Sequence, residues 1–145
     1  YNQIYTSEQA FFDDLEQMNS IIKAQTGNDA SIIRFPGGSS NTVSKDYCPG
    51  IMTQLVNDVT ARGLLYCDWN VSSGDANNKP ISTEQVVQNV ISGVQSHNVS
   101  VVLQHDIKDF SVNAVEQIIQ WGQANGYTFL PLTTSSPMSH HRINN

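Results

Sequence analysis

Ionisable side chains stand at the ends of three apolar segments that are predicted to be β-strands. They are Arg34 after the first segment, Asp68 and Asp75 at or after the second, and His105 and Asp106 after the third. In parallel α/β folds, functional groups gather where the carboxyl ends of the strands meet. A guanidinium, a carboxylate and an imidazole brought to one such edge can transfer protons and stabilise charge. The spacing therefore predicts an acid–base site.

Each of these residues also has a plainer interpretation. Arg34 could form a structural ion pair, and His105 could be a histidine at the rim whose hydrogen bonds are satisfied. A single aspartate in a loop, such as Asp75, is usually a cap. The occurrence of all three residue types at equivalent points of the alternation favours the functional interpretation.

The elements that position these residues alternate regularly along the chain. Helices are expected from the apolar spacing and capping residues, with capping boxes at Ser7 and Ser82 and glycine ends at Gly27, Gly63 and Gly126. The helices are expected to begin at Ser7, to span Gly50–Arg62, to begin at Ser82, and to span about Val112–Asn125. Strands are expected near 31–35, 64–69, 99–104 and 127–130. Helix, turn and strand repeated in this way predict one α/β domain with parallel strands.

Composition excludes several classes of protein. The 145 residues carry seven Lys and Arg against thirteen Asp and Glu, a formal net charge of -6. With no basic run, a nucleic-acid partner is not expected. There is also no apolar stretch of about 18 residues, so no transmembrane segment is predicted. Cys48 and Cys67 are compatible with one disulfide or with two thiols.

Three motifs resemble those of a known family. "RFPGG" at 34–38, "WNVSSGDA" at 69–76 and "VVLQHD" at 101–106 are similar, in residues, order and spacing, to the later motifs of polysaccharide deacetylases. This is the NodB-homology group of carbohydrate esterase family four. The resemblance extends over essentially the whole chain. It implies part of a distorted (β/α) barrel that hydrolyses the acetamide of N-acetylglucosamine units in peptidoglycan, chitin or related polymers.

The resemblance also implies roles for individual residues. Arg34 would orient an aspartate base and keep it ionised, and the backbone N–H at Gly37 would donate to the oxyanion. His105 would protonate the leaving amine, with Asp75 as the carboxylate that favours its protonated form. Asp68 is the rival for that carboxylate.

The same resemblance implies a substrate groove. Leu103 would contact the acetyl methyl group, and Pro36 and Trp69 would contact substrate. The family usually has Trp directly after the motif aspartate, whereas this chain has Ala76, so one aromatic wall of the groove is in doubt. Trp69 is a candidate replacement.

Two earlier motifs of the family are missing, and they supply the aspartate base and an Asp-His-His site for a divalent metal. Asp13 and Asp14 in "FFDD" imitate the first motif but lie within an amphipathic helical pattern. The expected domain is therefore 1–145 as a partial catalytic domain whose first strands lie outside these residues. Zinc or a similar metal is expected in the complete enzyme and none in this chain. The family implies an extracellular or cell-wall location.

Other candidates carry weaker signals. His140 and His141 lie in a polar segment that is expected to be a solvated end, with no third metal ligand at suitable spacing. Ser39 or Ser40 could imitate a hydrolase nucleophile, but the Gly-x-Ser-x-Gly elbow is absent. The glycine turn at 37–38 lacks the Gly-Lys-Ser/Thr of a phosphate-binding loop.

Two classes of function remain open from the sequence. One is a metal-dependent deacetylase whose 145-residue part is inactive alone. The other is a non-catalytic carbohydrate-binding or scaffold module derived from the same fold. Because the predicted sheet lacks its first strands, an exposed edge or uncovered apolar face is also expected, with self-association as one consequence.

Overall fold

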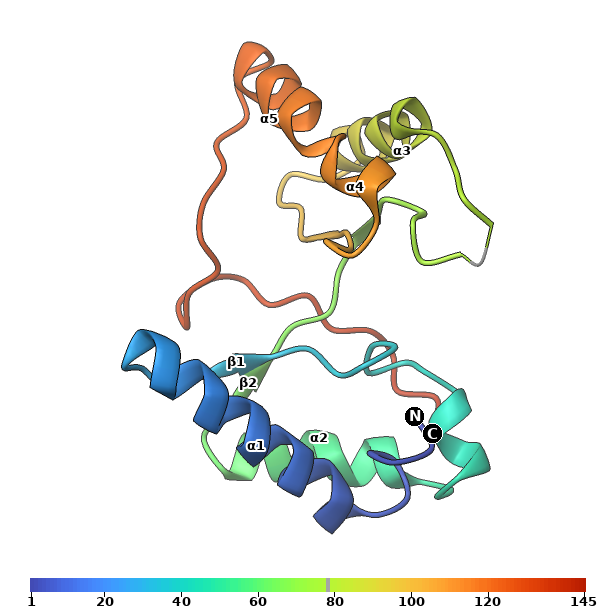
Figure 1. Cartoon of the computed structure of the whole chain (residues 1–145), viewed down its shortest axis with the longest axis vertical. Coiled ribbons are helices and arrows are strands. Elements are labelled where there is room, and N and C mark those ends of the chain that lie inside the picture. Colours follow the sequence, from blue (N-terminus) through green and yellow to red (C-terminus); the bar gives the residue numbers. More distant parts are fainter. Residues whose placement is uncertain (78) are drawn as a thin grey trace. The chain divides into compact units, whose positions relative to one another are not determined.

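The computed structural model describes residues 1–77 and 79–145, which form two compact units. The first unit combines Tyr1–Asp68 with Thr133–Asn145, and the second is Trp69–Leu132. Both units are built from helices and short parallel strands (Figure 1). The second unit is therefore continuous in sequence, whereas the first is completed by the last residues of the chain.

The first unit contains α1 (Glu8–Thr26), the 3₁₀ helix η1 (Val43–Asp46) and α2 (Ile51–Ala61). The α1 helix begins as predicted, because the Ser7 hydroxyl accepts a hydrogen bond from the Ala10 N–H at 3.1 Å. It ends at Gly27, which adopts the left-handed conformation (φ 77°) and donates its N–H to the Lys23 carbonyl. Both ends of the longest helix thus follow from local sequence.

The strands of the first unit are β1 (Ile32–Ile33) and β2 (Leu65–Tyr66), which pair in parallel. In Figure 1, α1 and α2 lie on the same side of this pair. Apolar side chains from both helices and from the residues around the strands form a core: Tyr5, Phe11, Phe12, Phe35, Ile51, Met52, Leu55 and Val59. The core holds the carboxyl ends of β1 and β2, where Arg34 and Asp68 follow, next to each other.

The second unit contains β3 (Val71–Ser72), α3 (Thr83–Gln95), β4 (Val102–Leu103), α4 (Asp109–Val112) and α5 (Val115–Ala124). The Ser82 hydroxyl caps α3 by accepting from the Gln85 N–H at 3.1 Å. The β3 and β4 strands are parallel, and a core of Val86, Val87, Val90, Ala114 and Ile118 joins α3 to the helices that follow β4. This arrangement brings the loop after β3 next to the loop after β4.

The prediction of parallel strands alternating with helices is confirmed, but three details differ. The strands form two separate two-stranded sheets among the described residues, and the barrel is not closed. The predicted strand at 127–130 is wrong: these residues are not part of a strand, and Phe129 and Leu130 are 52% and 80% exposed. A strand requires the hydrogen-bonding groups of a neighbour, and among the described residues no strand pairs with this segment. The last predicted helix, about Val112–Asn125, corresponds to α5 (Val115–Ala124), and a separate short helix, α4 (Asp109–Val112), precedes it.

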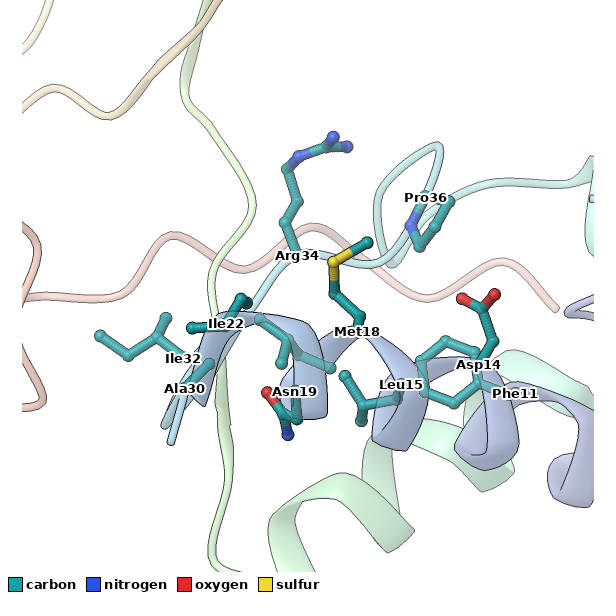
Figure 2. A pocket seen from close by; sticks show the side chains of 11 residues that line it. Phe11, Asp14, Leu15, Met18, Asn19, Ile22, Ala30, Ile32, Arg34 and Pro36 are labelled. Atoms are coloured by element: carbon teal, nitrogen blue, oxygen red, sulfur yellow. The ribbon is translucent and has the colours of Figure 1, made fainter. Parts of the chain in front are cut away.

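An apolar groove of about 250 Å³ runs between α1 and β1. Figure 2 shows Leu15, Met18 and Ile22 projecting from α1 along it, with Ile32 of β1 on the other side. Because each sheet has only two strands, the outer edge of β1 is also unpaired among the described residues. An uncovered apolar surface was expected from the sequence. Association of another chain through this edge stays a prediction.

Two simpler expectations can be compared with the structure. Cys48 and Cys67 are free thiols, the second of them buried, so the alternative of a disulfide is excluded here. No helix among residues 1–77 and 79–145 is long and apolar enough to cross a membrane.

Candidate active site

Asp75 and His105 form a close pair in the second unit. Asp75 lies in the loop after β3 and is 2% exposed, and His105 lies in the loop after β4. The Asp75 Oδ1 atom is 2.8 Å from His105 Nδ1, and Oδ2 accepts the His105 backbone N–H at 2.7 Å. A carboxylate at Nδ1 favours a proton on that nitrogen, which leaves Nε2 as the reactive atom. The imidazole is 29% exposed, so it can reach a ligand.

Two further residues hold the Asp75 loop. The Ser111 hydroxyl of α4 donates to Asp75 Oδ2 at 2.6 Å. The Lys108 ammonium donates to the backbone carbonyl of Asp75 and, at 3.3 Å, to that of Asn77. The carboxylate therefore has a fixed orientation, with both oxygens engaged by donors from the segment 105–111.

These contacts determine the acidity of Asp75. Burial alone raises the pKa of its carboxyl, because the charged form loses hydration. Hydrogen bonds from Ser111, from the ring and backbone of His105, and from Ser73 outweigh burial and lower the pKa from 3.8 to about 2. Asp75 is therefore ionised throughout the range in which a histidine titrates.

Asp68, the rival carboxylate, has entirely different partners in the first unit. It follows β2, is 2% exposed, and accepts hydrogen bonds from the Ser39 N–H at 2.8 Å and the Ser39 hydroxyl at 2.5 Å. A third donor is the His141 backbone N–H at 2.9 Å. The structure thus pairs Asp75, and not Asp68, with His105.

The segment after β1 contains Arg34 and Gly37. The Arg34 guanidinium points away from α1 (Figure 2), is exposed, and donates to the Phe35 carbonyl at 3.4 Å. No acidic side chain among the described residues pairs with it, so the structural ion pair considered from the sequence finds no support.

The turn at Gly37 is tightly constrained. Its φ of +79° favours glycine, and a Cβ at this position would lie 2.6 Å from the Tyr1 hydroxyl. The Tyr5 hydroxyl donates to the Pro36 carbonyl at 2.8 Å, and the Gly38 N–H donates to the Phe35 carbonyl at 2.7 Å. The geometry of the turn is therefore fixed from both sides of the chain.

The segment around His140 and His141, predicted to be a solvated end, leaves His140 exposed and His141 half-buried, but both residues contact the first unit. The His140 ring stacks on Tyr66 with centroids 4.1 Å apart, and His141 Nδ1 is 3.0 Å from the Ser40 hydroxyl. The segment is ordered because backbone and side-chain groups of the first unit accept or donate to it. Asp13 and Asp14, in contrast, lie on exposed positions of α1, where the amide of Gln9 donates to Asp13 at 2.6 Å.

The remaining predicted site residues divide between the units. Pro36 is exposed after β1, Trp69 is half-buried before β3, and Leu103 is half-buried in β4. Since Arg34, Gly37 and Pro36 belong to one compact unit and Asp75, Leu103 and His105 to the other, their convergence on one rim stays a prediction.

The described residues do not fit a metal centre. No three His, Cys, Asp or Glu side chains within 1–77 and 79–145 gather closely enough to hold an ion. We therefore assign no step of a reaction to a metal held by these residues.

Sequence reasoning missed Ser111 and Lys108. Their signal is weak, because a serine and a lysine within six residues of a histidine are common in any loop. The useful indication was that Asp109 follows a strand–His-Asp segment and can begin a short helix. Such a helix turns its next residues back toward the strand end.

Parallel strands alternating with helices and an Asp–His pair after β3 and β4 describe an α/β protein with a candidate acid–base site, and comparison with known proteins identifies its family. The chain is 98% identical, with a TM-score of 0.99, to the crystal structure of the catalytic domain of peptidoglycan N-acetylglucosamine deacetylase from Eubacterium rectale. It is covered completely and spans 66% of that chain.

More distant relatives agree. A Bacillus cereus peptidoglycan-N-acetylglucosamine deacetylase is 28% identical over 123 residues, which are 82% of this chain and 42% of that protein. A polysaccharide deacetylase structure, also from Bacillus cereus, has the same fold with a TM-score of 0.66 at 24% identity, over 92% of this chain and 61% of that one. No family model matches the sequence. The chain belongs to the polysaccharide deacetylases of carbohydrate esterase family four.

Proposed function

We propose that this chain supplies the acid and charge-stabilising part of a deacetylase, through Arg34, Gly37, Asp75 and His105. The deacetylase would hydrolyse the acetamide of N-acetylglucosamine units in a polysaccharide such as peptidoglycan. The observation that supports this most directly is the contact between ionised, buried Asp75 and the partly exposed His105. The names of the relatives supply the substrate class. The chain spans less than half of the curated relative, so the activity of the whole protein is part of the proposal.

His105 is assigned the role of general acid. Water adds to the acetamide carbonyl to give a tetrahedral intermediate, whose carbon–nitrogen bond then breaks. A poor leaving group such as an amine must be protonated as it departs, and His105 Nε2 gives up that proton. Acetate and a free amino sugar are the products. Asp75 compensates the imidazolium charge before the transfer and holds the ring in place.

Arg34 and Gly37 are assigned roles that the family resemblance implies. The unpaired guanidinium of Arg34 would bind an aspartate that accepts the proton of the attacking water, in the two-pronged geometry that arginine favours. The Gly37 backbone N–H would donate to the oxyanion, a contribution of roughly 10²–10³ in rate. Leu103, Trp69 and Pro36 would contact the sugar and its acetyl group.

The proposal divides the site into two parts. The members of this family depend on a divalent metal, which would supply Lewis-acid chemistry at the substrate carbonyl. The residues described here do not provide its ligands. We therefore expect the 145-residue chain alone to be inactive and a protein extended at the amino end to be active.

Acetate release tests this directly. The 145-residue chain and a version extended by the family's first two motifs are incubated with chitooligosaccharides or peptidoglycan fragments, with and without added zinc. We expect metal-dependent release only from the extended protein. Turnover by the 145-residue chain would contradict the division of the site, with Asp13, Asp14, His140 and His141 the first ligands to test. An inactive extended protein that still binds the sugar would favour the non-catalytic module.

A further inference from the structure

We propose that Ser111 is a positioning residue for the Asp75–His105 pair, fixing the carboxylate so that Oδ1 faces the imidazole. The inference rests on the proposed role of that pair in catalysis. It adds a residue that lies five positions beyond the end of the last family motif in this sequence. Ser111 does not touch the reacting atoms and acts only through Asp75.

The two oxygens of Asp75 have different tasks. Oδ1 contacts His105 Nδ1, whereas Oδ2 accepts both the His105 backbone N–H at 2.7 Å and the Ser111 hydroxyl at 2.6 Å. Both of the other contacts come from His105, so they hold the carboxylate relative to the loop after β4 only, and the last torsion of the side chain is soft. A second donor on the same oxygen, from another element, removes that freedom.

The Ser111 hydroxyl is itself held in place. Its residue is 0% exposed, and the Gln104 side-chain amide donates to the Ser111 carbonyl at 2.6 Å. The Ser111 N–H donates to the Lys108 carbonyl at 2.9 Å, which closes the first turn of α4. A helical serine often donates to the carbonyl one turn earlier, but here the hydroxyl is directed at Asp75.

The effect of Ser111 on the pKa of Asp75 can be separated from the effects of the charged groups around Asp75. Among the described residues, the titratable side chains in contact with Asp75 are His105 at Oδ1 and Lys108 at its backbone carbonyl. Ser73 and Ser111 are neutral. Ser111 is therefore the neutral side chain that donates across elements to Oδ2, and removing its hydroxyl changes no charge.

The test is a titration of Asp75 in the 145-residue chain, followed by the ¹³C chemical shift of its carboxyl carbon. Ser111→Ala removes the donor and retains a good helix former, so α4 should persist. We expect the titration midpoint to rise by about one pH unit, since hydrogen bonds to a charged group are strong. The ¹H–¹⁵N signal of His105 Nδ1–H should broaden at the same time, because the ring loses its fixed acceptor.

Two further variants keep the test decisive. Ser111→Cys has nearly the same size but a weak donor, and should shift the midpoint in the same direction by less. Ser44→Ala removes a hydroxyl from an equally buried serine in the first unit, whose oxygen accepts from Asn145 at 2.8 Å, and should leave Asp75 unchanged. An unchanged Asp75 midpoint in folded Ser111→Ala and Ser111→Cys would overturn the proposal. Because the titration of Asp75 needs no substrate, it tests the role of Ser111 separately from deacetylase activity.

Discussion

Asp68 and Asp75 are two aspartates in similar surroundings with different partners. Each follows a short parallel strand, is 2% exposed, and accepts at least three hydrogen bonds. The donors to Asp68 are two backbone N–H groups and a hydroxyl, and they connect the loop after β1 to the carboxyl-terminal segment. One donor to Asp75 is an imidazole that remains partly exposed.

The difference shows how the same side chain serves two purposes. Around Asp68 every described donor is a group that does not titrate near neutral pH, so the aspartate connects segments of chain. Around Asp75 the donors orient a carboxylate toward a group that can give up a proton. Four predictions distinguish the connecting role of Asp68 from the orienting role of Asp75.

Replacing His105, which contacts Asp75, should reduce the rate of acetate release far more than replacing His141, whose backbone contacts Asp68. In the extended protein, His105→Ala should lower the rate of acetate release by roughly 10²–10⁴, the usual range for a general acid. His141→Ala keeps the backbone N–H that Asp68 accepts, and should reduce the rate less than about tenfold. Equal losses in kcat for the two variants would remove the basis for assigning the acid to His105.

Asp68→Ala should be the most destabilising change in the first unit. It leaves the buried Ser39 N–H without an acceptor and releases the His141 segment, at a cost of about 3 kcal/mol. Amide hydrogen exchange in α1 and α2 measures this locally. Asp68→Asn retains one acceptor oxygen and should cost less, so a loss in Asp68→Asn as large as in Asp68→Ala would contradict a connecting role.

Acid should weaken the second unit through Asp75. Because its pKa in the folded chain, about 2, is below its ordinary value of 3.8, its stabilisation is complete above about pH 4 and is lost as the pH falls toward 2. The free energy of unfolding should decrease by about 2 kcal/mol over this window. Both tryptophans, Trp69 and Trp121, lie in this unit, so their fluorescence in urea reports the change.

Asp75→Asn is the control for the acid effect. Its carboxamide does not titrate, so the component of the pH dependence between about 4 and 2 should disappear. A profile identical to that of the unaltered chain would mean that other carboxyl groups cause the acid sensitivity.

Ser39→Ala should have the smallest effect. The variant removes the hydroxyl donor to Asp68 but keeps the backbone donor, so about 1 kcal/mol of stability should be lost. Urea unfolding followed by circular dichroism measures it, with Ser44→Ala as a buried serine that does not contact Asp68. A loss as large as that of Asp68→Ala would mean that the hydroxyl alone holds the segment.

The helix ends and part of the candidate site could be predicted from the sequence, because they depend on residues that are close together in the chain or on short motifs. Ser7, Gly27 and Ser82 cap helices through residues three or four positions away, and the three motifs indicated Asp75 and His105. Residue type and position alone did not separate Asp68 from Asp75, because both lie at or after the end of the same predicted strand. The family resemblance favoured Asp75, and the partners across the chain distinguish the two.

Longer-range causes explain the errors. Phe129 and Leu130 have the residue types of a strand, but pairing depends on a neighbouring strand that the sequence pattern does not reveal. His140 and His141 seemed a polar end, yet Tyr66 and Ser40 bind them from positions 74 and 101 residues away. Ser111 has no local signal, since its role exists only through Asp75.

The discontinuous first unit also has a consequence for the order in which the chain can fold during synthesis. Residues 133–145 leave the ribosome after residues 1–132, and Asn144 donates to the Ser40 carbonyl across 104 positions of sequence. The second unit, Trp69–Leu132, can acquire all its own contacts earlier. Until His140 and His141 emerge, Asp68 lacks its His141 donor and Tyr66 lacks the ring that stacks on it. A nascent chain from which only the residues up to 132 have emerged therefore exposes an unfinished first unit to chaperones, while the second unit has all its residues available.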